Sequence, residues 1–442
     1  MNTFFKGTLL LIIAAFIGEC VEFLINLVLA KELGGHGMGL YMTILPSIFL
    51  VVILASLELP ISISKFIAEK EDRYHKSMLK HATVLTTVFT AIIISLAFVI
   101  LPVIPVFDDY HPFVRWLVIL FIPIVSFLSI ARGYFMGIQS MGRIAFANFL
   151  RKAVQLILLV FIYQLLEFEI HTSILIALCT LVASDLIVFG YLGYEYLIHY
   201  RRLGHRPTSS LSGKAVRKNL LAVSLPTTGM RIFHAISHAV QPFLIKAALL
   251  KAGMPAAVAT EHFGLMTGVA LTIGFFPAFI AHSLLIVLIP TVSEAYSKRD
   301  MPMLQNLLKQ VMRMTFLYGV PACVIFYYFA EPLTHIFFES SSATVYLQML
   351  WPYFLFHFFL IPMQAYLIGL GLVKDAFIHN VWSTIVSFGI MFALGSLQTL
   401  QMEGIIIGMN MGAVLLALLH YVTICRKIGV SIFSIKFLHT AS

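Results

Sequence analysis

The sequence has few charged residues and few cysteines for its length. Charged side chains make up 11% of the 442 residues, whereas hydrophobic ones make up 60%. A water-soluble core of one chain cannot bury so much apolar surface. The four cysteines are far apart and lie in apolar segments, which argues against both a zinc site and a disulfide framework. They are Cys20, Cys179, Cys323 and Cys425.

The short motifs of common enzymes are missing as well. The sequence contains no GxxxxGK[ST] phosphate loop, no HExxH helix and no GxSxG elbow. Its polar loops are too short to house a catalytic domain. We therefore expect no enzymatic activity, no cofactor and no bound metal ion, and any transport would be driven by a gradient, by substrate turnover or by a partner.

Long apolar runs dominate the sequence instead. A membrane-spanning helix needs about 20 apolar residues, because its backbone polar groups find no water in lipid. We count twelve such runs, which predict an all-α integral membrane protein. The first run, 8–30, is too long for a signal-peptide core and lacks a small-residue cleavage site, so we expect it to be retained. The eighth is expected at 263–292.

Basic residues predict the orientation of these runs. Cytoplasmic loops are rich in Lys and Arg, and most of the 29 in this sequence fall in connections that are cytoplasmic if the N-terminus is inside. We therefore expect both termini in the cytoplasm and the chain in the cytoplasmic membrane. The net charge of +9 then reflects topology and attraction to anionic membrane lipid, so no nucleic-acid partner is needed to explain it.

The longest polar connection divides the runs into two sets of six. The two sets resemble each other, since Tyr, Gly and Asn residues of Tyr134–Asn148 recur in Tyr366–Asn380. An even number of helices per set makes this repeat parallel, as in transporters whose lobes rock around a central site. We predict an N-terminal six-helix lobe at 1–199, a basic cytoplasmic linker at 200–218, a C-terminal six-helix lobe at 219–425 and a cytoplasmic tail at 426–442.

Two of the apolar runs carry a stripe of polar residues. Positions i, i+3 and i+7 share one face of an α-helix, so Glu19, Glu22 and Asn26 form one stripe. Because a charge at mid-membrane costs about 2.5–3.5 kcal/mol, neither stripe should face lipid. An ungapped alignment of the lobes places the first stripe on a second one in the seventh run. That stripe consists of Arg231, His234, His238 and Gln241.

Two interpretations of the stripes stay open. They form either a charge-balanced clamp between the lobes or the walls of a water-filled cavity. In the second case the basic stripe would bind an anionic head group, and the acidic one would act as a gate or couple transport to an ion, since neighbouring carboxylates favour holding a proton. Four further polar residues carry less weight, because each has a structural explanation. They are Glu58, Lys65, Arg132 and Asp185.

Several segments resemble one known family. These are LVLAKELGGHGMGLYMTILPSIF, LPISISKFIAEKE and ARGYFMGIQSMGR. They are similar to the stage V sporulation protein B-like, polysaccharide biosynthesis branch of the multidrug/oligosaccharidyl-lipid/polysaccharide flippase superfamily. The resemblance covers essentially the whole chain. It implies a two-lobed fold with alternating access that moves a polyprenyl-linked saccharide or peptidoglycan precursor to the outer leaflet.

The sequence departs from its family in two respects. Lipid II flippases carry arginines on the first helix, where this chain has Glu19 and Glu22, and we find no counterpart of the two further helices that form a lipid groove in many members. We expect a flippase-like transporter of a lipid-linked cell-envelope or spore-envelope precursor, in the forespore or mother-cell membrane, with envelope-synthesis proteins as partners. The alternatives are a multidrug-exporter-like cation antiporter, which would move cationic dyes, and a non-transporting membrane scaffold, whose phenotype would survive neutralisation of both stripes.

Overall fold

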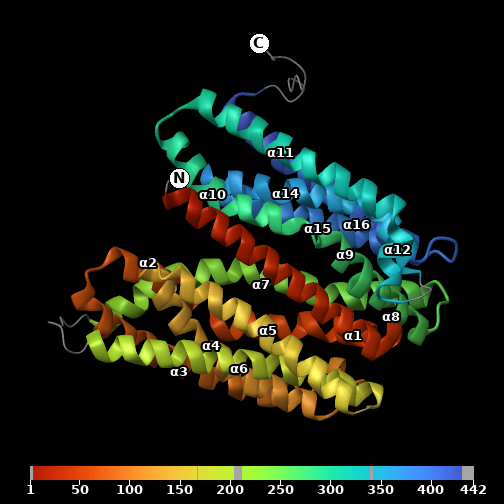
Figure 1. Ribbon diagram of the computed structural model, residues 1–442, viewed down its shortest axis with the longest axis horizontal. Coiled ribbons are helices and arrows are strands. Elements are labelled where there is room, and N and C mark those ends of the chain that lie inside the picture. The colour runs from red at the N-terminus through yellow and green to blue at the C-terminus, as the bar shows by residue number, and fades with distance from the viewer. Residues whose placement is uncertain (1–2, 167, 204–211, 339–341, 431–442) are drawn as a thin grey trace. The chain divides into compact units, whose positions relative to one another are not determined.

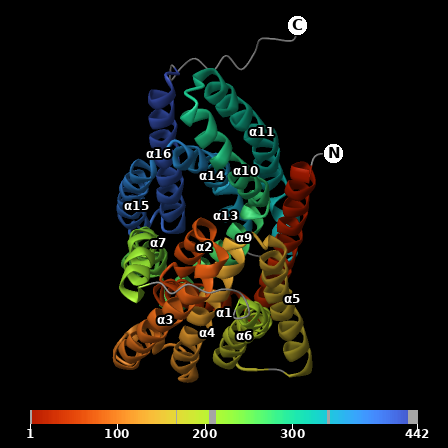
Figure 2. The ribbon, with the colours of Figure 1, turned by 90° about the vertical axis from the view of Figure 1, so that its left-hand side faces the viewer.

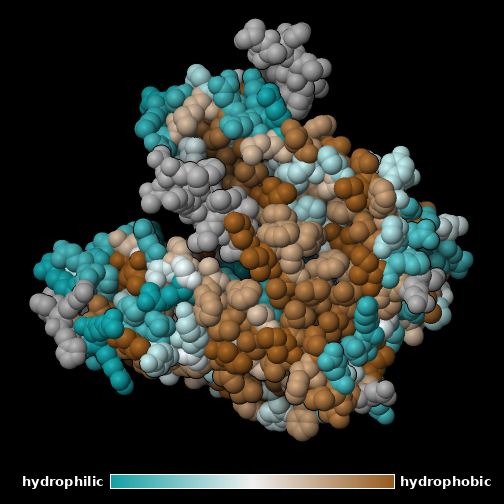
Figure 3. Space-filling model, in the orientation of Figure 1, coloured by the Kyte–Doolittle hydropathy of each residue, from teal (hydrophilic) through white to brown (hydrophobic). Residues whose placement is uncertain are grey.

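The computed structural model describes residues 3–166, 168–203, 212–338 and 342–430. Within these ranges all regular structure is helical, and twelve stretches are long and apolar enough to cross a membrane. Figure 3 shows large areas of hydrophobic surface on the face toward the viewer, with hydrophilic residues gathered in separate patches. The chain is a multi-pass, all-α membrane protein, which confirms the predicted fold class. Parts of the predicted linker and tail lie outside the described residues.

The chain divides into two compact units. One is Leu24–Pro242, and the other combines Met1–Phe23 with Phe243–Ser442. Both borders fall inside helices rather than in loops, because α1 (Thr3–Ser56) and α7 (Gly213–Lys251) each run from one unit into the other. The predicted lobe and linker boundaries stay predictions.

Helix α4 is the central helix of the unit Leu24–Pro242. It packs against α2, α3, α5 and α6, and half of its apolar stretch is buried inside the protein. A helix in this position loses access to lipid and is available to line an internal cavity. The helices of this unit, besides its parts of α1 and α7, are α2 (Leu59–Glu69), α3 (Asp72–Ile100), α4 (Phe113–Gly137), α5 (Met141–Leu165) and α6 (Ile170–Leu203) (Figure 1).

Helix α14 is the central helix of the other unit. It packs against α10, α11, α15 and α16. The N-terminal segment of α1 belongs to this unit, where the Phe16 ring lies 5.2 Å from that of Phe279 and the Phe23 ring 5.3 Å from that of Phe337. The helices that follow α7 are α8 (Ala256–Gly264), a π-helical turn (Leu265–Ala270), α9 (Leu271–Phe275), α10 (Ala278–Ser297), α11 (Met301–Tyr328), α12 (Ala330–His335), α13 (Ala343–Met349), α14 (Trp351–Gly369), α15 (Val373–Gly395) and α16 (Met402–Ile428) (Figure 2).

The same close helix contact occurs once in each unit. A Cβ atom on Gly137 of α4 would lie 2.5 Å from the Cβ of Ile67 on α2, and one on Gly369 of α14 would lie 2.7 Å from the Cβ of Val292 on α10. The turns that follow also match, since Gln139 and Gly371 both have positive φ. The two segments with similar sequences, Tyr134–Asn148 and Tyr366–Asn380, therefore also have the same local structure.

Glycines at the helix ends give a second alignment of the two halves. Gly34 interrupts α1 with φ 66°, and Gly253 follows α7 with φ 86°. Matching these two glycines places Glu19 on His238 and not on Arg231, which is a shift of two helical turns along the same face.

The eighth run, predicted as one helix, is divided in the structure, because Phe276 and Pro277 separate α9 from α10. The first run, 8–30, and the second, predicted at 41–68, both lie within α1 and α2, with the non-helical Gly34 between them.

Three glycines bring α16 against α15. Cβ atoms on Gly404, Gly408 and Gly412 would each come within 2.6 Å of an atom of α15. At Gly408 these atoms include the backbone nitrogen of Met391, which cannot rotate away. Glycines spaced four residues apart allow such close approach between membrane helices, where dispersion forces replace the hydrophobic effect.

We expect Gly408→Ala to lower the free energy of unfolding by about 1–3 kcal/mol, because the added methyl group overpacks the α15–α16 contact. Gly389→Ala on α15 is the matched control, since a Cβ atom at that position would meet no neighbouring side chain or helix within 4 Å. Thermal unfolding of both variants in detergent measures the difference. Equal midpoint temperatures would show that α16 does not pack this closely.

Candidate functional site

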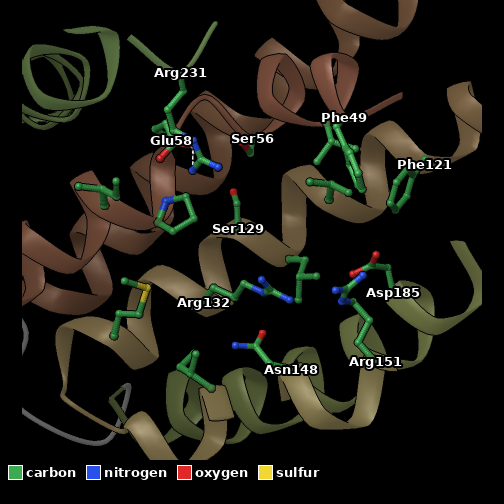
Figure 4. A pocket seen from close by; sticks show the side chains of 17 residues that line it. Phe49, Ser56, Glu58, Phe121, Ser129, Arg132, Asn148, Arg151, Asp185 and Arg231 are labelled. Carbon is green, nitrogen blue, oxygen red and sulfur yellow. Dashed lines mark hydrogen bonds and ion pairs between the residues drawn. The ribbon is translucent and has the colours of Figure 1, made fainter. Parts of the chain in front are cut away.

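A cavity of about 630 Å³ lies within the unit Leu24–Pro242 (Figure 4). Its lining comes from α1, α2, α4, α5, α6 and α7, and one end is apolar, with Phe49 and Phe121. The volume is in the range of small-molecule and cofactor sites. The ionisable residues that line the cavity are Glu58, Arg132, Arg151, Asp185 and Arg231.

Glu58 lies at a break between α1 and α2. Leu57 and Glu58 both have left-handed backbone conformations, with φ of 47° and 49°, and Pro60 follows in the first turn of α2. Such conformations cost about 1–2 kcal/mol for each residue that is not glycine, so the surrounding structure must hold them. The break directs the Glu58 side chain into the cavity although only 4% of the residue is exposed.

Helix α4 satisfies one of the backbone groups at this break. The Ser126 hydroxyl lies 3.0 Å from the carbonyl oxygen of Ala55 and 2.8 Å from that of Ile122 on its own helix, and its one proton is shared between these two acceptors. A carbonyl freed by a helix break would otherwise remain unpaired in a buried, low-dielectric region. Ser126 therefore helps α4 to hold the end of α1, next to the cavity that both helices line.

Arg231 of α7 forms the closest charged contact of the cavity. Its Nη1 atom donates to Oε1 of Glu58 at 2.5 Å. The two side chains differ in exposure: that of Glu58 is 5% exposed and that of Arg231 is 56% exposed. The guanidinium group thus compensates the charge of a buried carboxylate, while more than half of the Arg231 side chain itself stays exposed.

The opposite side of the cavity holds a second charged group. Arg132 of α4 and Arg151 of α5 act electrostatically on Asp185 of α6, and Figure 4 shows these side chains pointing toward one another. Within the described residues, Nε of Arg132 is buried and has no hydrogen-bond partner. The hydroxyl of Ser129 and the amide of Asn148 also line the cavity.

The cavity contains one more guanidinium than carboxylate. Guanidinium groups bind phosphate and carboxylate oxygens through paired N–H donors, and their attraction for an anion is stronger in a low-dielectric site than in water. The arrangement is therefore suited to bind an anion, with apolar side chains at one end.

The residues of the predicted acidic stripe are divided between the two compact units. Of the basic stripe, Arg231 lines this cavity, whereas His234, His238 and Gln241 are absent from its described lining. Glu19 and Glu22 belong to the other unit, where Glu19 acts electrostatically on His282 of α10. Asn26 follows on α1 in the unit Leu24–Pro242. Their roles as head-group and gate residues stay predictions.

Three of the four residues that carried less weight in the sequence line the cavity. Glu58, Arg132 and Asp185 come together there, whereas Lys65 is exposed and lies 3.8 Å from Glu69. Arg151 is a site residue that sequence reasoning missed. The signal was a charge in the apolar run of α5, three residues after Asn148 and hence on the same helix face.

Comparison with solved structures defines the class of fold. The chain matches an inward-facing multidrug resistance transporter of the MATE family, within the MOP superfamily, with a TM-score of 0.73 and 18% identity over 93% of this chain and 94% of that one. The family model "Polysaccharide biosynthesis protein" matches residues 4–295, and the model "MatE" matches residues 266–394. The chain belongs to the polysaccharide biosynthesis protein family, which confirms the resemblance found in the sequence.

Three relatives from Bacillus subtilis (strain 168) support this membership. Sporulation protein YkvU is 55% identical over 98% of this chain and 97% of its own length. Stage V sporulation protein B is 32% identical over 98% of this chain and 85% of its own length. Lipid II flippase MurJ is 22% identical over 96% of this chain and 83% of its own length.

Proposed function

We propose that the protein moves a lipid-linked saccharide or peptidoglycan precursor from the inner to the outer leaflet of the cytoplasmic membrane by alternating access. The excess of guanidinium groups in the cavity carries this proposal, because the diphosphate of such a precursor is anionic. The name of the relative MurJ, a lipid II flippase, agrees with this substrate class.

The cavity residues have separate roles in this proposal. Arg132 and Arg151 bind the diphosphate, while Asp185 and Asn148 orient the two guanidinium groups. Arg231 reaches the head group from α7. The apolar end, with Phe49 and Phe121, accommodates uncharged parts of the head group.

The cellular setting is part of the same proposal. The protein acts as a transporter and not as an enzyme, with both termini in the cytoplasm, as the distribution of its 29 Lys and Arg residues favours. Its direct partners are membrane lipid and the lipid-linked precursor, and envelope-synthesis proteins supply or consume that precursor. The sporulation names of two relatives favour a role in spore-envelope synthesis.

Leaflet translocation in proteoliposomes tests the function. A fluorescent polyprenyl diphosphate saccharide, placed in one leaflet, should become accessible in the other leaflet at a rate that depends on the protein. A polyprenyl saccharide without phosphate is the matched control and should move at the rate of protein-free liposomes. If correctly folded protein moves no polyprenyl diphosphate saccharide, whatever its head group, the proposal is wrong.

A cation antiporter is the second candidate function. Two carboxylates, Glu58 and Asp185, line the same cavity, and cations bind to such groups when neighbouring arginines move away. Accumulation of cationic dyes under a proton or sodium gradient would support this alternative, provided that the diphosphate saccharide does not move.

A further inference from the structure

We propose that Glu58 takes up one proton when an anionic head group binds Arg231, so that head-group binding is coupled to proton uptake. This inference rests on the proposed function, because it requires an anionic head group in the cavity. The observation behind it is the unequal exposure of the two partners in the Glu58–Arg231 ion pair.

An anion in the cavity reaches only one member of this pair. More than half of the Arg231 side chain is exposed, whereas that of Glu58 is almost completely buried. Phosphate oxygens can therefore approach the guanidinium from its open side and compete with the carboxylate for its N–H donors. The head group replaces Glu58 as the partner of Arg231.

Glu58 cannot follow Arg231 toward the head group. Its backbone is held in the left-handed break between α1 and α2, which Ser126 fastens to α4. A carboxylate that loses its cation in a buried position carries a large desolvation penalty. Protonation removes that penalty: the buffer acid gives up a proton, water at the cavity opening relays it to the carboxylate oxygen, and the group becomes a neutral carboxylic acid.

The other ionisable groups of the cavity favour Glu58 over Asp185 as the proton acceptor. Asp185 of α6 experiences two cations, Arg132 of α4 and Arg151 of α5. Among the described residues, Glu58 forms an ion pair with Arg231 of α7 alone. When that one cation is withdrawn, Glu58 loses its ion pair. Asp185 keeps two cations beside it, because in the proposed site it orients Arg132 and Arg151 while they bind the diphosphate.

Calorimetric titration in buffers of different ionisation enthalpy measures the proton uptake. The probe is farnesyl diphospho-N-acetylglucosamine, because each of its phosphates has one ester bond and one anhydride bond and therefore stays singly charged near neutral pH. Purified protein in detergent should take up about one proton for each head group bound. The Glu58→Gln variant should bind the probe with little or no proton uptake.

Two further variants make the assignment specific. Glu195→Gln is the matched control, because Glu195 forms a 3.0 Å ion pair with Arg143 outside the described cavity lining, and uptake should equal that of the wild type. Asp185→Asn changes the other carboxylate of the cavity and weakens binding, but each head group that it does bind should still bring about one proton. Binding without uptake in the wild type, or uptake lost in Asp185→Asn and kept in Glu58→Gln, would overturn this inference and leave the proposed function intact. If the wild type binds no probe and moves no diphosphate saccharide, both fail.

Discussion

Replacement of both Arg132 and Arg151 by glutamine is expected to slow translocation of a polyprenyl diphosphate saccharide by about 100- to 10,000-fold. Hydrogen bonds to charged groups contribute about 1.5–3 kcal/mol each, and each 1.4 kcal/mol corresponds to a factor of about ten. Both arginines line the cavity on the side of Asp185. The initial rate of leaflet exchange in proteoliposomes measures the effect.

Two controls separate this loss of binding from a folding defect. Adding Asp185→Asn to the double variant removes the carboxylate that would otherwise remain buried without a cation, and the rate should stay low. Arg217→Gln changes an arginine at the start of α7 whose Nε bonds to the carbonyl oxygen of Gly213 on its own helix, and translocation should be unaffected. A double variant that is folded and transports at the wild-type rate would remove these arginines from the site.

The second large effect is expected from Arg231→Ala, which should lower the free energy of unfolding by about 3 kcal/mol. Removing one member of a buried ion pair leaves an uncompensated charge, and the cost is about 3–5 kcal/mol. We expect a loss at the lower end of this range, because the Arg231 side chain is itself 56% exposed. Denaturant unfolding in detergent micelles measures the change.

A double-mutant cycle shows whether Glu58 is the cause of this loss. Combining Arg231→Ala with Glu58→Gln should restore part of the stability, with a coupling energy of about 1.5–3 kcal/mol between the two sites. The same cycle on Lys65 and Glu69, whose side chains are 57% and 58% exposed, should give only about 0.2–1 kcal/mol. Additive effects at Arg231 and Glu58 would mean that the ion pair contributes nothing.

The membrane fold and the internal repeat could be predicted from the sequence. Apolar runs of about 20 residues have few alternatives to a spanning helix, and Gly137 and Gly369 were visible as members of the repeated segment. Pro60 indicated a kink near Glu58, but the left-handed conformations of Leu57 and Glu58 could not be predicted, because neither residue favours them. The contacts that hold the break, from Ser126 of α4 and Arg231 of α7, are visible only in the tertiary structure.

The candidate site was predicted in part. Arg231 was recognised as an intramembrane charge that needs a partner, but the sequence alignment placed it opposite Glu19, and its structural partner is Glu58. Periodicity tells which residues share a helix face, but not which face of another helix they meet. The convergence of Arg132, Arg151 and Asp185 therefore requires the tertiary structure, since α4, α5 and α6 each contribute one residue.

The division of α1 between the units has a consequence for synthesis of the protein. The unit Leu24–Pro242 is complete once a single continuous segment has been made, whereas Met1–Phe23 finds its aromatic neighbours only after Phe276, Phe279 and Phe337 have left the ribosome. At about 5–20 residues per second, this delay is on the order of tens of seconds. The first segment to enter the membrane must therefore wait there, next to lipid or to an insertion factor, until the second half of the chain arrives.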